Sequence, residues 1–220
     1  MRFEPKRVTL FCGHYGSGKT NLAVNYALAL AASGRPAALA DIDIVNPYFR
    51  SADSRAELES AGVEVIALPF AGSNVDLPSL PSAVYGLVER RDRFAVLDVG
   101  GDDRGAYALG RFSPYILAED DYDMLFVVNF CRPLTRTAEE ALDVMREISA
   151  VCPIPFTAIV NNTNVGPDTT ADVIAAGDAQ ARALSALTGL PVAMTGAERD
   201  AVLPAGIENV FRLTLQKKII

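Results

Sequence analysis

The stretch GHYGSGKT at residues 13–20 constrains the fold of this chain more than any other feature of the sequence. It matches the pattern G-x-x-x-x-G-K-[ST], in which glycines let backbone N–H groups approach the oxygens of a phosphate. Apolar residues 7–12 precede the stretch, and an alanine- and leucine-rich segment, 18–32, follows it. The sequence therefore predicts a buried strand, a phosphate-binding loop and a helix whose positive dipole end faces the phosphate.

The residues of this loop are the predicted nucleotide-binding residues. Lys19 is expected to reach the β- and γ-phosphates and to act in catalysis, and the hydroxyl of Thr20 is expected to bind Mg²⁺. The loop also contains His14, the only histidine of the chain. The full predicted set around the phosphates is Gly13, His14, Tyr15, Gly16, Ser17, Gly18, Lys19, Thr20 and Asn21.

Short apolar runs alternate with helical patterns along the chain. The runs are continuous rather than alternating in polarity, which is typical of strands buried on both faces of a parallel sheet. They predict an α/β fold with a doubly wound, mostly parallel sheet flanked by helices, in a single nucleotide-binding domain, 1–220. The predicted strands are 7–12, 37–42, 63–68, 94–99, 124–129, 155–160 and 191–194, and the predicted helices are 18–32, 138–150, 170–187 and 207–217.

Two aspartates end the second predicted strand, in the stretch ALADIDIVNPYFRS. Asp41 and Asp43 share one side of the strand if it runs through Ile44, because side chains alternate between its faces. They lie at the edge of the sheet that carries the phosphate loop. We expect Asp43 to orient or activate the attacking water as a catalytic residue and Asp41 to lie near the Mg²⁺ ion. The alternative is that both aspartates only cap turns at the strand end.

A third carboxylate ends the fourth predicted strand, in the stretch RFAVLDVGGDDRG. Asp98 follows four mostly apolar residues, a pattern similar to a Walker B strand, whose carboxylate binds Mg²⁺ directly or through water. Gly101 is expected to approach the γ-phosphate through its backbone N–H. The predicted metal-binding set is Thr20, Asp41, Asp43 and Asp98.

The order of the phosphate loop, DIDIVNPYF and VLDVGG resembles the CobQ/CobB/MinD/ParA nucleotide-binding family, the deviant-Walker P-loop ATPases. The resemblance implies ATP binding with Mg²⁺, slow hydrolysis and often a homodimer with nucleotide sandwiched between the subunits. It assigns Asp43 to the switch I catalytic aspartate and Asp98 to the Walker B aspartate. It also implies that Asn161, or its neighbour Asn162, lies against the adenine ring.

The chain departs from this family at its signature loop, K-G-G-x-G-K-[ST]. His14 stands where the family has a lysine that contacts phosphate across the dimer, and Tyr15 replaces the next glycine. Whether His14 is a hydrogen-bonded spacer or meets the nucleotide or a dimer partner stays open. The N-K-x-D guanine motif is absent, which favours ATP over GTP. Arg132 and Arg136 follow a predicted strand end and lie at the same edge, where they contact nucleotide, a partner or solvent.

The composition excludes several other classes of protein. The formal net charge of −7 argues against broad binding of nucleic acid or anionic membranes. Three scattered cysteines and one histidine argue against zinc. The sequence shows no signal peptide and no membrane span, so we expect a cytoplasmic protein.

Three hypotheses about function follow from these patterns. The leading one is a ParA/MinD-like ATPase that binds ATP or ADP and forms a homodimer. An unidentified protein partner is compatible with this hypothesis. The second is a P-loop small-molecule kinase or ATP-dependent ligase, whose second-substrate pocket would involve residues 69–81 and 102–115. The third is a nucleotide-gated adaptor that does not hydrolyse ATP.

Overall fold

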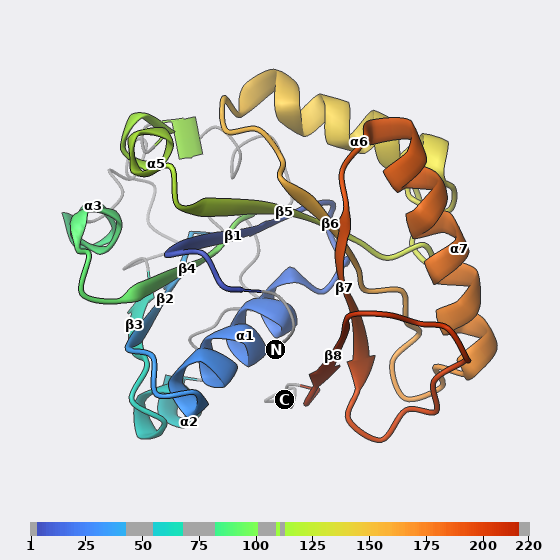
Figure 1. Cartoon of the computed structure of the whole chain (residues 1–220), viewed down its shortest axis with the longest axis horizontal. Coiled ribbons are helices and arrows are strands. Elements are labelled where there is room, and N and C mark those ends of the chain that lie inside the picture. The colour runs from blue at the N-terminus through green and yellow to red at the C-terminus, as the bar shows by residue number, and fades with distance from the viewer. Residues whose placement is uncertain (1–3, 43–54, 68–81, 101–108, 111–112, 216–220) are drawn as a thin grey trace, which may run out of the picture.

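The computed structural model describes residues 4–42, 55–67, 82–100, 109–110 and 113–215. Within these residues, eight parallel strands form one sheet in the order β3-β2-β4-β1-β5-β6-β7-β8 (Figure 1). The strands are β1 (Val8–Cys12), β2 (Ala37–Asp41), β3 (Glu64–Ala67), β4 (Phe94–Asp98), β5 (Tyr122–Val128), β6 (Ala158–Asn161), β7 (Val192–Glu198) and β8 (Val210–Leu213).

Helices cover both faces of this sheet, which confirms the predicted doubly wound architecture (Figure 1). One face packs against α1 and α2, and the other packs against α3, α5, α6 and α7. The helices in the described residues are α1 (Lys19–Ala32), α2 (Arg55–Ser60), α3 (Ser82–Glu89), α5 (Ser113–Glu119), α6 (Ala138–Val151) and α7 (Ala171–Thr188).

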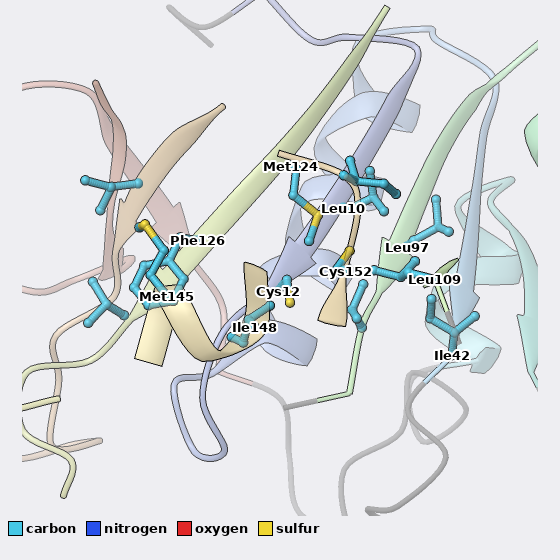
Figure 2. Packing of buried hydrophobic residues seen from close by; sticks show 14 of the residues in the cluster. Leu10, Cys12, Ile42, Leu97, Leu109, Met124, Phe126, Met145, Ile148 and Cys152 are labelled. Carbon is cyan, nitrogen blue, oxygen red and sulfur yellow. The ribbon is translucent and has the colours of Figure 1, made fainter. Parts of the chain in front are cut away.

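Apolar side chains leave β1 alternately toward the two faces, so the strand is buried from end to end. Leu10 and Cys12 point to the α6 side, where they meet side chains such as Met124 and Ile148 (Figure 2). Phe11 points to the α1 side and packs edge-to-face on Tyr26, with ring centroids 5.4 Å apart. Burying an aromatic or branched side chain of this size stabilises the fold by about 1.5–3 kcal/mol.

Two helices, α6 and α7, begin at or within one residue of their predicted starts, 138 and 170. The hydroxyl of Thr137 accepts a hydrogen bond from the Glu140 N–H at the start of α6, and Thr170 accepts one from Val173 at the start of α7. Such N-caps satisfy an otherwise unpaired N–H group and contribute about 1 kcal/mol each. α7 ends at Gly189, which adopts the left-handed conformation common at helix C-termini.

The predicted last helix, 207–217, is wrong. Val210–Leu213 form β8, which pairs in parallel with β7 at the edge of the sheet. Its Val-Phe-Arg-Leu sequence suits a strand, and its side chains pack against the α1 face of the sheet, with Phe211 6.2 Å from the Tyr26 ring. Helical spacing in a short apolar segment does not exclude a strand, and here the tertiary contacts decide.

In the part of the chain that the structure describes, no helix combines the length and the hydrophobicity needed to cross a bilayer.

Candidate phosphate-binding site

The C-terminal ends of the parallel strands lie at one edge of the sheet, where ligands of open α/β folds bind. The phosphate loop follows β1 at this edge, and its last glycine, Gly18, is the N-cap of α1. The loop that follows β5 and the loop that follows β6 flank it on one side, and the ends of β2 and β4 flank it on the other. The topology therefore gathers most of the predicted site residues around the N-terminus of one helix.

The backbone of the loop needs glycine at three positions. Gly13, Gly16 and Gly18 have φ angles of 149°, 76° and 89°, which residues with a side chain rarely adopt. Space is also short, since a Cβ on Gly13 would lie 2.2 Å from the carbonyl oxygen of Val127. The loop is closed by a turn in which the Ser17 N–H donates to the His14 carbonyl at 3.2 Å. This conformation directs backbone N–H groups toward a bound anion.

Lys19 reaches back over the loop that precedes it. Its side chain is buried, and Nζ donates a 3.2 Å hydrogen bond to the carbonyl oxygen of His14. The ammonium group is thus held at the loop beside the N-terminus of α1. A phosphate in the loop would accept a hydrogen bond from the same group, which is the role that the sequence predicts for it.

The two described aspartates of the site lie side by side. Asp41 and Asp98 are register partners in β2 and β4, and their side chains are 3% and 1% exposed. Alternation along each strand places both on the α1 side of the sheet, since their neighbours Ala40 and Leu97 pack on the opposite side. Asp98 is also the register partner of Phe11 in β1, one residue before the last residue of that strand. Two carboxylates thus face the helix that carries Thr20.

This arrangement fits a magnesium ion that is bound together with a phosphate. Among the described residues, no group of three or more His, Cys, Asp or Glu side chains could hold a metal ion alone. Mg²⁺ differs from zinc because it binds through one or two carboxylates, water and phosphate oxygens. In addition, the buried Ser17 hydroxyl has no hydrogen-bond partner among the described residues. Thr20, Asp41 and Asp98 therefore have the right chemistry and place for the ion, whereas the predicted residues Asp43 and Gly101 lie outside the described residues.

The two asparagines predicted near the base point in different directions. Asn162 donates a 2.7 Å hydrogen bond from Nδ2 to the Ser17 carbonyl, so its amide group lies against the phosphate loop. Asn161 is fully buried on the other side of the sheet, where its Oδ1 accepts hydrogen bonds from the N–H and the hydroxyl of Thr163. Thr163 in turn packs against Gly177 of α7. The structure therefore brings only Asn162 of this pair to the loop.

The side chain of Asn162 also leaves no space for a side chain at two glycine positions. A Cβ on Gly18 would lie 2.3 Å from Asn162 Nδ2, and a Cβ on Gly196 in β7 would lie 2.5 Å from Asn162 Oδ1. The sequence motif accounts for Gly18, but no sequence pattern marks Gly196, which lies 176 positions after the last residue of the loop, Thr20. The link from β7 through Asn162 to the loop is visible only in three dimensions.

The remaining side chains of the loop face outward or bond within the loop. Nδ1 of His14 lies 3.1 Å from the Tyr15 carbonyl oxygen, and the His14 carbonyl is bound by Lys19. The Tyr15 side chain is exposed. Just before the loop, burial raises the pKa of the Cys12 thiol to about 12, so this thiol stays protonated near neutral pH.

Comparison with solved structures gives the fold. The cell division protein FtsY of Thermotoga maritima superposes with a TM-score of 0.61 over 88% of this chain and 62% of its own, at 18% identity. Chloroplast FtsY of Physcomitrella patens has a TM-score of 0.59, covers 94% of this chain and 61% of its own, and is 19% identical. The signal recognition particle 54 kDa protein of Aeropyrum pernix, in complex with GDP, has a TM-score of 0.58 over 92% and 42%, at 17% identity.

No protein-family model and no curated protein sequence matches the chain. The chain spans about three fifths of the length of the FtsY structures. These structures are FtsY and signal recognition particle proteins, whereas the sequence motifs resemble the CobQ/CobB/MinD/ParA family. At this sequence identity the likeness shows the fold and not the activity. What they establish is the α/β fold, a parallel sheet with helices on both faces. In this chain the phosphate loop, the buried aspartates Asp41 and Asp98, and Asn162 lie at the ligand edge of that sheet.

Proposed function

We propose that this chain binds ATP with Mg²⁺ and hydrolyses it slowly, as a nucleotide-dependent switch of the ParA/MinD type. The observation that carries the proposal is the phosphate loop itself, in which three positive-φ glycines and the Lys19 ammonium surround the N-terminus of α1. The paired aspartates Asp41 and Asp98 on the α1 side support the Mg²⁺ part of the proposal.

The residues divide the chemistry in a simple way. Backbone N–H groups of the loop and Lys19 would bind the phosphates, while Thr20 and Asp98 would hold Mg²⁺ directly or through water. Water would attack the γ-phosphorus, the bond to the β-phosphate oxygen would break, and ADP and phosphate would leave. The resemblance of DIDIVNPYF assigns the positioning of that water to Asp43. Positioning and charge stabilisation would supply most of the rate.

The choice of ATP rests on the segment NNTN, residues 161–164. In the guanine-recognition motif N-K-x-D, the aspartate at the fourth position of the motif binds guanine. The fourth residue of the segment NNTN is Asn164, which has no carboxylate. Both ends of its amide are used within the loop, since Nδ2 donates to the Asn162 carbonyl at 2.7 Å and Oδ1 accepts from the Gly166 N–H at 3.2 Å. GTP is the competing ligand, because the Aeropyrum pernix neighbour and one of the FtsY neighbours are complexes with GDP.

Homodimerisation through the nucleotide edge is the second part of the proposal. Tyr15, Leu134 and Val165 are exposed large apolar residues, and they follow β1, β5 and β6 at this edge. Exposed apolar side chains gathered around a ligand site favour contact with another protein surface. A second copy of the chain is the partner that the family resemblance implies, and a cytoplasmic location is part of the same proposal.

A single set of measurements tests the function. We expect Mg-ATP to bind more tightly than Mg-GTP by calorimetry, to be hydrolysed slowly and to increase the light-scattering mass. Lys19→Ala should abolish binding, whereas Asp43→Ala should abolish phosphate release and spare binding. Tighter GTP binding would overturn the choice of base, and normal turnover in the Asp43 variant would overturn the mechanism. A large rise in ADP formation on adding a second substrate would favour the kinase or ligase alternative.

A further inference from the structure

The loop after β5 places an arginine side chain over the phosphate loop. The Cδ and Nε atoms of Arg132 lie 3.8 Å from the position that a Cβ on Gly16 would occupy. Gly16 has a positive φ and no side chain, so the guanidinium stem lies directly against the backbone that would surround a phosphate. Within the described residues the Arg132 side chain is exposed and makes no ion pair, hence its charge is available to a ligand.

The backbone that carries Arg132 is held in place by Asn129, which is buried. The carbonyl of Asn129 accepts hydrogen bonds from the Arg132 N–H at 3.0 Å and from the Thr135 hydroxyl at 2.9 Å. Its side-chain Oδ1 accepts from the Cys131 N–H at 3.0 Å, and Nδ2 donates to the Asn164 carbonyl at 3.1 Å. The loop is thus bonded both to itself and to the loop after β6, and the position of Arg132 is defined by the fold.

The backbone after Arg132 shows a second sign of constraint. Pro133, the residue after Arg132, has a φ that its own ring restricts. The following residue, Leu134, adopts a φ of 65°, and its side chain is 63% exposed. Left-handed backbone is unfavourable for a branched residue and persists where the surrounding structure imposes it. Leu134 is exposed, so its own burial does not impose this conformation, which lies two residues after Arg132 in the same loop.

The charge balance of the site, between a bound triphosphate and the phosphate loop, favours a second positive side chain. A triphosphate with one Mg²⁺ ion keeps negative charge that the single lysine of the loop does not neutralise. His14 occupies the place of the lysine that the sequence resemblance leads one to expect, and its carbonyl and ring are engaged within the loop. Arginine suits the missing role because its guanidinium stays charged and can donate two hydrogen bonds to one phosphate.

We propose that Arg132 binds the phosphate chain of the nucleotide in the same subunit and supplies the second positive charge that the loop itself lacks. The proposal rests on the proposed nucleotide-binding function and adds to it a residue outside the sequence motif. Arg132 would be a phosphate-binding residue delivered by the β5–α6 loop, so the chain would not need a basic residue from a partner to neutralise the phosphates.

The test compares nucleotide affinity in Arg132→Ala, Arg132→Lys and the matched control Arg136→Ala. Arg136 is an exposed arginine in the same loop, so its removal changes the net charge equally. Dissociation constants for the slowly hydrolysed analogues ATPγS and GTPγS are measured with Mg²⁺ by calorimetry, using for each variant the analogue that the wild type binds more tightly. We expect Arg132→Ala to weaken binding about tenfold, as for loss of a charged hydrogen bond. Arg132→Lys should recover part of the loss, and Arg136→Ala should stay within about twofold of the wild type.

Two controls distinguish a failure of the Arg132 proposal from a failure of the proposed nucleotide-binding function. The melting temperature of each variant without nucleotide should equal that of the wild type, because both side chains are exposed. The proposed function fails if the wild type binds neither analogue. It also fails if the Lys19→Ala variant binds the analogue as tightly as the wild type does. If binding depends on Lys19 but Arg132→Ala binds like the wild type, or Arg136→Ala loses as much as Arg132→Ala, the function stands and the role of Arg132 is overturned.

Discussion

Asn162 Nδ2 donates a 2.7 Å hydrogen bond to the carbonyl oxygen of Ser17, a residue 145 positions earlier in the chain. The bond joins the end of β6 to the phosphate loop at the residue before Gly18. Since the peptide planes of the loop must point their N–H groups at the phosphate, a fixed carbonyl at Ser17 also fixes the direction of the next N–H group. The side chain therefore prepares the loop for an anion.

The first prediction concerns this bond. Asn162→Ala leaves the Ser17 carbonyl without its donor, a loss that typically costs about 1–3 kcal/mol. We expect the affinity for nucleotide to fall about tenfold or more, and the amide hydrogens of residues 17–20 to exchange faster in the free protein. Calorimetry and hydrogen-exchange mass spectrometry measure the two effects.

Asn161→Ala is the control for that prediction. Asn161 is as buried as its neighbour but bonds to Thr163 on the other side of the sheet. Its removal should lower the melting temperature and leave the affinity of the folded protein within about threefold of the wild type. An equal loss of affinity in both variants would mean that Asn162 acts only through general stability.

A second prediction tests the contact between β7 and Asn162. In Gly196→Ala the new Cβ would lie 2.5 Å from Asn162 Oδ1 and 3.2 Å from a methyl carbon of Leu213. We expect weaker nucleotide binding, because Asn162 must move away from Ser17. Removing the amide relieves the clash, so Asn162→Ala with Gly196→Ala should cost less than the sum of the single changes.

Gly86→Ala is the matched control, because Gly86 sits inside α3 and no atom of the described residues lies within 4 Å of its Cβ position. Alanine is favoured over glycine in a helix by up to about 1 kcal/mol, so this variant should be as stable as the wild type or more so. Strict additivity in the Gly196 cycle would contradict the proposed link to the loop.

Much of the fold could be predicted from the sequence because its signals are local. Continuous apolar runs identified β1 to β7, and helical patterns identified α1, α6 and α7. The segment 210–213 was predicted as a helix because its apolar spacing is ambiguous in so short a run. Its strand conformation depends on pairing with β7 and on packing against α1, which are contacts with residues far away in sequence.

The same distinction applies to the site. Glycine and lysine positions in the phosphate loop follow from a motif, since each residue acts through its own backbone or charge. The pairing of Asp41 with Asp98 requires strand order, which places β2 beside β4 rather than β1. The direction of Asn162 and the approach of Arg132 to Gly16 depend on how two loops pack, and a single sequence carries no signal for such contacts.

A third prediction addresses the edge strand β8. The side chain of Asn25 in α1 bonds to both backbone polar groups of Thr214, with Nδ2 donating to its carbonyl at 3.0 Å and Oδ1 accepting from its N–H at 2.8 Å. Asn25→Ala leaves both groups without these partners at the end of β8. We expect a loss of about 1–3 kcal/mol, or a melting temperature lower by roughly 2–10 °C in a chain of this size.

Hydrogen exchange localises the effect of that change. Amides of 210–214 should exchange faster in Asn25→Ala, while those of the central strand β5 should change only with global stability. Ser33→Ala serves as a control, because Ser33 lies at the other end of α1. Among the described residues its hydroxyl bonds locally, donating to the Leu30 carbonyl and accepting from exposed Arg35. Uniform acceleration across the sheet would show that the Asn25 contact is not specific to β8.

The last prediction concerns pH and the carboxyl of Asp123 in β5. Its side chain is 7% exposed, Oδ1 accepts a 2.8 Å hydrogen bond from the Thr157 hydroxyl, and Oδ2 has no partner among the described residues. Burial raises the pKa of this carboxyl above its ordinary value. An acid with a raised folded-state pKa binds its proton more tightly in the folded protein than in the unfolded one. It therefore costs stability once the pH exceeds the unfolded pKa, and the cost is complete above the folded pKa.

Asp123→Asn removes that cost and keeps an acceptor for Thr157. We expect the variant to have a higher melting temperature than the wild type at pH 7, because the wild-type carboxylate is then charged and buried. The gain should shrink as the pH falls toward the ordinary range of a carboxyl, since the wild-type group is then protonated in both states. Asp143→Asn, an exposed partner of Arg146, should show no such gain at either pH. A gain that is constant from pH 7 down to pH 4 would mean that the stabilisation comes from packing and not from the charge of Asp123.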